Sequence, residues 1–190
     1  MYNVITTIFN SINFKGNIVK THNFYNNPQN LYIITMRHPY NSVISFSLLY
    51  NNEIDNKNIQ ESIIKYLQHG GKDMCDIDLN LPNIIIFKYE DFKDNIDYIF
   101  DILSKKLNIV ITDEIKNEIK NKTNIENVIN YTSQYKSFNE HCKITHLHGN
   151  HISKYKGNTN YKNYIDNVNN TDNISFENED LSYLIKKFLY

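Results

Sequence analysis

The chain has 190 residues, a formal net charge of −1 at pH 7, 41% hydrophobic residues and 13% aromatic residues. A chain of this length can bury a core, and we expect a single domain over 1–190, or one domain with a tail. The balanced charge gives no electrostatic attraction toward nucleic acid or an anionic membrane, so neither is expected as a partner.

Short apolar runs alternate with amphipathic segments along most of the chain. In chain order, hydrophobic spacing predicts a helix over 4–12, strands over 17–22 and 31–36, a helix over 39–49, a helix over 59–68 closed by Gly70 and Gly71, a strand over 84–89, and helices over 90–107, 112–120 and 124–131. No periodicity marks 132–161, which we interpret as a long functional or mobile loop. Helical spacing is found again at 161–165 and at 180–189, the latter within a C-terminal tail over 166–190.

Strands that alternate with helices are typical of the α/β class, in which helices flank a parallel sheet. Ligands of such sheets bind at the carboxyl ends of the strands. Three predicted strands end in polar and ionisable residues, at 20–22, 37–38 and 88–91. We therefore expect the functional site at this edge of the sheet.

Arg37 is the only arginine among the 20 lysine and arginine residues. Abundant Lys, Asn and Ile indicate a codon bias that favours lysine, so the single arginine invites a chemical explanation. It lies between a predicted strand and a helix that begins near Pro39. A guanidinium beside the free N–H groups of a helix N-terminus is a good phosphate site. A structural ion pair and an arginine retained by chance are the alternatives, and the sequence alone leaves all three open.

The two cysteines, Cys75 and Cys142, are too few for a disulfide framework and suit a reducing compartment. The first residues lack the pattern of a signal peptide, and no apolar segment approaches the roughly 20 residues that span a bilayer. We expect a cytoplasmic protein.

Four segments, in order along the chain, resemble motifs of the sulfotransferases that use 3′-phosphoadenosine 5′-phosphosulfate. Lys20-Thr21-His22 resembles the family's KTH strand end. Arg37-His38-Pro39 with Ser45 resembles its R-D-P-x-x-x-x-x-S strand–helix, and Tyr89-Glu90-Asp91-Phe92 resembles its YED strand end. Residues 152–164 resemble its RKGxxGDWKNYF loop. The resemblance implies an α/β fold like that of the P-loop NTPases.

The resemblance also implies roles for the residues at the first two strand ends. His22 would be the general base that takes a proton from the acceptor, which suits a neutral imidazole near pH 7. Lys20, two residues before it on the same face of a strand, would stabilise charge on the sulfuryl group. Arg37 and Ser45 would hold the 3′-phosphate of the nucleotide. The structural alternatives are a polar strand end for His22, a solvated cation for Lys20 and an interior helix serine for Ser45.

Further nucleotide contacts are implied for Tyr89 and for Ser137 with Phe138, which would stand for a segment near the adenine. Thr132-Ser133 is an equally good register for that segment. Tyr89 is alternatively a half-buried strand aromatic. Glu90 and Asp91 fit an N-cap pair of the following helix better than a catalytic role.

The loop over 152–164 would place Lys154, Lys156 and Gly157 at the nucleotide phosphate. It departs from the family pattern at Thr159, where a second glycine is usual, and Gly157 lies one residue from the usual register. Lys154 and Lys156 are alternatively part of an ordinary charged loop. His38 stands where the family has an acidic residue.

No segment matches the family's first strand and its YPKSGTTW-like loop, which binds the 5′-phosphosulfate. Without that loop the leaving phosphate lacks its main electrostatic partner. We expect a chain whose start lies upstream or a relative that no longer catalyses. Completion of the site by another segment or chain is a third possibility.

A rival interpretation comes from the His141-Cys142 pair, with His146, His148 and His151 close behind. Imidazole and thiolate are the usual ligands of zinc, although this spacing matches no standard zinc motif. The chain would then be a small non-catalytic binding module with a metal site at 141–151.

The sequence favours a sulfotransferase-like protein without a metal. It would transfer a sulfuryl group from 3′-phosphoadenosine 5′-phosphosulfate to a hydroxyl or amine of a small-molecule or glycan acceptor. The identity of the acceptor is not predicted, because acceptor pockets are built from variable loops.

Overall fold

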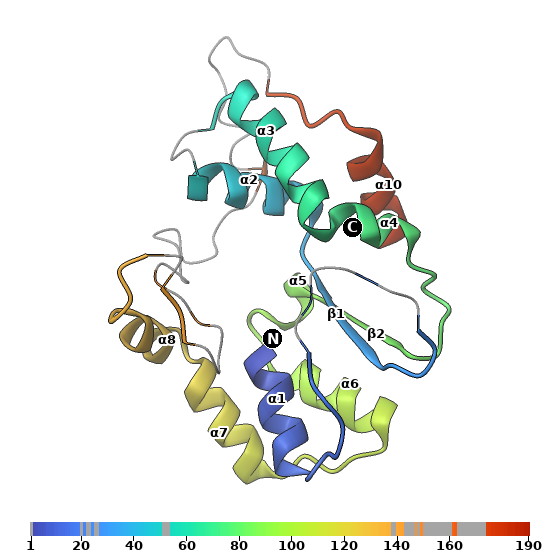
Figure 1. The fold of residues 1–190 in the computed structure, drawn as a ribbon, viewed down its shortest axis with the longest axis vertical. Coiled ribbons are helices and arrows are strands. Elements are labelled where there is room, and N and C mark those ends of the chain that lie inside the picture. The colour runs from blue at the N-terminus through green and yellow to red at the C-terminus, as the bar shows by residue number, and fades with distance from the viewer. Residues whose placement is uncertain are drawn as a thin grey trace. The chain divides into compact units, whose positions relative to one another are not determined.

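The computed structural model describes residues 2–19, 21, 24, 27–50, 54–137, 140–142, 147, 149, 161–162 and 174–190 (Figure 1). Over these residues the chain belongs to the α/β class, as the sequence predicts. It groups into two compact units, the first from 1–20 and 91–157 and the second from 21–90 and 158–190. Each unit contains buried hydrophobic residues.

The first unit is helical in its described part. Its helices are α1 (Tyr2–Ser11), α6 (Asp97–Leu107), α7 (Asp113–Thr123) and α8 (Ile125–Thr132). Their inward residues are those that the helical spacing selects: Val4, Ile5, Ile8, Phe9, Ile99, Phe100, Leu103, Ile119 and Val128. The predicted helices over 4–12, 112–120 and 124–131 are therefore confirmed.

The single helix predicted over 90–107 is wrong, because two helices occupy that range. α5 (Tyr89–Phe92) ends before α6 begins, and the chain turns between them. The turn contains Asp94 and Asn95, whose short polar side chains favour turns over helix interiors. The Asn95 N–H donates to the Phe92 carbonyl across this turn, at 3.2 Å.

The second unit contains a parallel pair of strands, β1 (Tyr32–Met36) and β2 (Ile84–Lys88). Tyr32 pairs with Ile84 at one end and Met36 with Lys88 at the other, so the two strands end level with each other. Figure 1 shows them side by side. Both were predicted from their apolar runs, and their parallel pairing is confirmed.

The strand predicted over 17–22 is not found in the described part of that range. Residues 17–19 and Thr21 have no regular secondary structure. Val19 is 77% exposed, so the short apolar pair Ile18-Val19 does not supply a buried strand face. Described residues thus provide two strands of the sheet, where the sequence predicts three.

Helices α2 (Pro39–Tyr50), α3 (Asn56–Tyr66), α4 (Lys72–Asp76) and α10 (Glu179–Lys187) complete the regular structure of the second unit, with a distorted turn, η1 (Leu67–Gly71), between α3 and α4. α2 packs against both α3 and α10. Alternate residues of the strands join these helices in one core cluster, formed by Ile34, Met36, Ile77, Ile84, Leu184 and Phe188. The predicted helices over 39–49 and 180–189 are confirmed.

The predicted stop at Gly70 and Gly71 is a kink between two helices. His69 and Gly70 leave the helical region, and Gly70 has φ 105°, which glycine adopts at little cost. The chain then enters α4, a helix that the sequence does not predict. α3 also begins earlier than predicted, because Asp55 caps it by accepting the Asn58 N–H at 2.7 Å.

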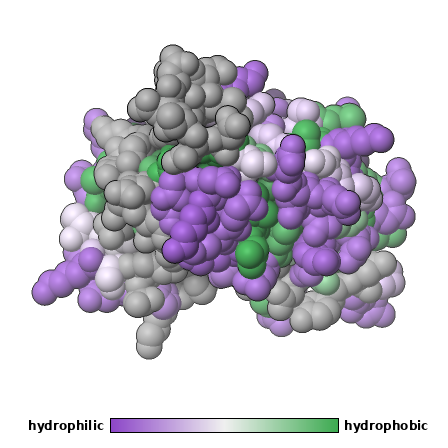
Figure 2. Space-filling view, turned by 90° about the horizontal axis from the view of Figure 1, so that it is seen from above, coloured by the Kyte–Doolittle hydropathy of each residue, from purple (hydrophilic) through white to green (hydrophobic). Residues whose placement is uncertain are grey.

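Hydrophilic side chains cover most of the described surface on the face in Figure 2, and hydrophobic side chains lie between them in small areas. This distribution agrees with a mean hydropathy of −0.54. None of the helices in the described part of the chain combines the length and the apolar character that crossing a membrane requires.

We expect Gly70→Ala to lower the free energy of unfolding by about 1–2 kcal/mol, because a Cβ is disfavoured at positive φ. Gly70→Asn should lower it less, since asparagine tolerates this region. Urea unfolding followed by circular dichroism measures both. Equal stability of Gly70→Ala and the unaltered chain would contradict the kink.

Candidate active site

Polar residues from the two strand ends meet in the second unit. Because Met36 pairs with Lys88, the residues that follow them are neighbours: Arg37 and His38 on one side, Tyr89 and Glu90 on the other. The Arg37 guanidinium carbon lies 5.2 Å from the centroid of the Tyr89 ring, a cation–π contact. The expected gathering of polar and ionisable residues is therefore found for two of the three predicted strand ends.

Arg37 is half-buried, and this has an electrostatic cost. Burial lowers the pKa of the guanidinium, while Tyr89 and Glu90 act in the opposite direction. An arginine remains protonated at neutral pH despite such a shift. Arg37 is thus a partly desolvated cation, and a desolvated cation attracts an anion more strongly than one in water does.

The Glu90 carboxylate connects the end of β2 to the start of α2. Its Oε1 atom accepts the backbone N–H of His38 at 3.0 Å and the Asn41 side-chain amide at 3.5 Å. The sequence predicts Glu90 as a cap of the helix that follows it. That prediction is wrong in its target, because Glu90 lies within α5 and bonds to the start of a different helix.

His38 is the N-cap of α2. Its Nδ1 atom accepts the Tyr40 N–H at 3.2 Å, and its carbonyl accepts the Ser42 N–H at 3.0 Å. Pro39 has no N–H, so the first turn offers fewer free donors than the sequence suggests. The expectation of free amide groups at this helix end is corrected accordingly, and Arg37 is the main candidate here for binding an anion.

An aromatic cluster surrounds the His38 ring. The ring stacks on Tyr161 with centroids 4.8 Å apart, and it also contacts Tyr40 and Tyr190. Burial lowers the pKa of His38; Glu90 partly offsets this, and Lys162 and Arg37 lower it further. Since Nδ1 accepts a hydrogen bond, the neutral ring carries its proton on Nε2.

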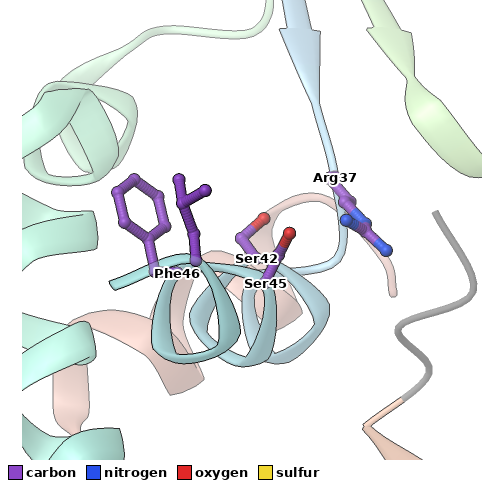
Figure 3. A pocket seen from close by; sticks show the side chains of 5 residues that line it. Arg37, Ser42, Ser45 and Phe46 are labelled. Atoms are coloured by element: carbon purple, nitrogen blue, oxygen red, sulfur yellow. The ribbon is translucent and has the colours of Figure 1, made fainter. Parts of the chain in front are cut away.

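A pocket of about 180 Å³ opens beside Arg37 along α2 (Figure 3). The other described residues that line it, Ser42, Ser45, Phe46 and Leu49, follow an i, i+3, i+4, i+7 spacing, so they share one face of the helix. The opposite face supplies the buried residues Val43, Ile44, Ser47 and Leu48. One helix therefore anchors the core and lines the pocket.

The two pocket hydroxyls are available for a ligand. Ser42 and Ser45 lie next to each other on α2 with their hydroxyls on the same side (Figure 3). Neither hydroxyl has a hydrogen bond to another described residue, whereas the Thr132 hydroxyl donates to the Val128 carbonyl of its own helix at 2.8 Å. A helix serine without such a backbone bond can donate to a bound anion.

Of the predicted nucleotide-binding residues, Arg37 and Ser45 line this pocket, and Tyr89 contacts Arg37. Ser137 belongs to the first unit, where its carbonyl accepts the Glu140 N–H at 3.2 Å. The other six predicted site residues lie outside the described residues: Lys20, His22, Phe138, Lys154, Lys156 and Gly157.

The alternative adenine register, Thr132-Ser133, has a different environment. Both hydroxyls donate to carbonyls in and next to the last turn of α8, Thr132 to Val128 and Ser133 to Asn130. These bonds give the pair a local structural role.

Three pocket residues were missed from the sequence: Ser42, Phe46 and Leu49. Their spacing with Ser45 was the available signal, because it marks a second face on a helix whose first face is apolar. Hydrophobicity alone does not show that the second face of such a helix lines a pocket.

Among the candidate metal ligands, His141 and Cys142 are described, and His146, His148 and His151 are not. The described ranges contain no group of three or more side chains that could hold a metal ion.

Comparisons with protein-family models, with curated proteins and with solved structures found no match to this chain. Membership of the sulfotransferase family therefore stays a prediction from the four sequence motifs.

Replacing Glu90 tests its bond to His38. We expect Glu90→Ala to lower the free energy of unfolding by about 1–3 kcal/mol, because the half-buried His38 N–H loses its acceptor. Glu90→Gln keeps an acceptor oxygen and should lower stability less. Chemical unfolding measures both, and an equal effect of the two variants would show that the charge matters and the acceptor does not.

The His38 environment makes stability depend on pH. A pKa that folding lowers contributes stability above the unfolded value of about 6.5, and this is lost as the pH falls toward the folded pKa. His38→Asn, which can still cap a helix, should therefore lose less stability than the unaltered chain between pH 8 and pH 5.

Unfolding at several pH values measures this difference, with His69→Asn as the control because His69 is exposed. Parallel pH profiles for the unaltered chain and His38→Asn would contradict the prediction.

Proposed function

We propose that the pocket beside Arg37 binds the 3′-phosphate of an adenine nucleotide, and that the chain is a sulfotransferase-like protein. One observation carries the proposal. Arg37 and Ser45, which the motif pairs as phosphate ligands across eight residues, line the same pocket. Nothing in the local hydrophobic pattern requires a serine at that position of the pocket face.

The chemistry of the pocket fits a phosphate monoester. A guanidinium presents planar donors that match phosphate oxygens, and serine hydroxyls add donors of neutral charge. The Tyr89 ring supports the guanidinium and restricts its motion, which reduces the entropy lost on binding. The nearby Glu90 carboxylate weakens the positive potential at Arg37, so the hydroxyl donors matter more.

The proposed reaction uses 3′-phosphoadenosine 5′-phosphosulfate, which would supply the activated sulfuryl group when bound. An acceptor hydroxyl or amine would attack the sulfur, and the bond from sulfur to the 5′-phosphate oxygen would break. His22 would take the acceptor's proton, and Lys20 would stabilise the charge that develops on the sulfuryl oxygens. These two roles depend on the resemblance alone.

Nucleotide binding and sulfuryl transfer are separable in this proposal. The pocket supports binding, while transfer also requires the partners of the 5′-phosphosulfate, for which the sequence offers no matching loop. Binding of adenosine 3′,5′-bisphosphate is therefore the part to test first.

We expect calorimetric titration with adenosine 3′,5′-bisphosphate to show binding that Arg37→Ala weakens by about 1–3 kcal/mol, or roughly fivefold to 150-fold. Arg37→Lys should bind with intermediate affinity, because lysine keeps the positive charge but lacks the planar set of N–H donors of the guanidinium. Lys57→Ala, which removes an exposed cation of the same unit, is the matched control.

The competing structural role for Arg37 predicts a different result. If Arg37 serves only to balance Glu90, Arg37→Ala lowers stability and leaves the bisphosphate affinity unchanged. That outcome, or a folded chain that does not bind the bisphosphate, would overturn the proposed function.

A further inference from the structure

The pocket changes character along α2. Arg37, Ser42 and Ser45 supply donors at its first end, and Phe46 and Leu49 supply apolar surface at the other. A helix rises about 1.5 Å per residue, so Ser42 and Leu49 are roughly 10 Å apart along the axis. A ligand that fills this length therefore needs an anionic group at one end and an apolar group at the other.

Phe46 forms a supported apolar wall. It is half-buried, and its ring contacts those of Tyr66 and His69, with centroids 6.5 Å and 5.9 Å apart. Burial, aided by Cys75, raises the pKa of Tyr66 to about 12, so the phenol behind Phe46 stays uncharged. A ring held in this way is a suitable surface for another flat ring.

The size of the pocket limits the ligand. Pockets that enclose a drug-sized molecule have volumes of roughly 300–1,000 Å³, and this one has about 180 Å³. It can take a phosphate group and part of what is bonded to it. The rest of a nucleotide would extend beyond the pocket.

We infer that the pocket selects a phosphate ester attached to a ring, with Ser42 as a second hydroxyl donor to the phosphate and Phe46 as the ring contact. The inference rests on the proposed function, because it concerns the same pocket, and it assigns roles that the family motif does not contain. Arg37, Ser42 and Ser45 together match the three terminal oxygens of a phosphate ester. Phe46 contributes to the binding affinity only when the ligand carries an apolar group.

The ligand preference can be measured on the unaltered chain with three probes: inorganic phosphate, phenyl phosphate and adenosine 3′-monophosphate. We expect both esters to bind about three- to tenfold more tightly than inorganic phosphate, the range of one ring contact. Equal affinities for the three probes would overturn the inference, and this result does not depend on the folding of any variant.

Variants assign the two roles. Phe46→Leu should reduce the preference for the esters and leave the affinity for inorganic phosphate unchanged, while Phe46→Tyr should retain the preference. Ser42→Ala should weaken the binding of all three probes by a similar factor, about two- to tenfold. Ile64→Ala on α3 and Ser133→Ala in the first unit are matched controls at exposed positions.

The outcomes separate the two proposals. If adenosine 3′,5′-bisphosphate binds and Arg37→Ala weakens binding, while Ser42→Ala and Phe46→Leu behave like the unaltered chain, the proposed function stands and the inference falls. If neither the bisphosphate nor any probe binds to the folded chain, both fall.

Discussion

The hydrogen bond from the His38 backbone to the Glu90 carboxylate, 3.0 Å long, joins the ends of the two strands of the second unit. It is possible because β1 and β2 run parallel and end level, which places residues 52 positions apart in the chain beside each other. The bond holds the backbone of the residue that precedes α2. Since the start of a helix sets the direction in which each later side chain points, a fixed start also sets which residues of α2 face the pocket.

α2 is held by its surroundings more than by its own sequence. Its serines, Asn41 and β-branched residues are modest helix formers, and its first turn contains no acidic residue. Packing of one face and capping by His38 compensate for this. The absence of acidic residues from this turn suits an anion site, and the Glu90 carboxylate, which bonds to this helix end, offsets part of that advantage.

The environment of Arg37 is compatible with both a structural role and the proposed binding role. Tyr89 and Glu90 stabilise its charge, which compensates part of the cost of burial. A cation balanced in this way does not need a ligand to be tolerated in the fold. An anion that enters the pocket then gains from a guanidinium whose desolvation and orientation are already established, which is the usual basis of preorganised recognition.

The sequence was sufficient to predict the elements whose buried residues recur at regular spacing. These are α1, α2, α7, α8, α10 and the two strands with their parallel pairing. Arg37 was selected because it is the only arginine, and the family motif paired it with Ser45; both residues line the same pocket. Periodicity failed in the described part of 17–22, where the apolar run is too short to bury, and at 93–96, where a polar turn interrupts a helical spacing. The Glu90 bond, the His38 cap and the place of Ser42 and Phe46 in the pocket came from the folded structure, because they depend on contacts between segments far apart in the chain, and local spacing carries no information about which distant segment will lie alongside.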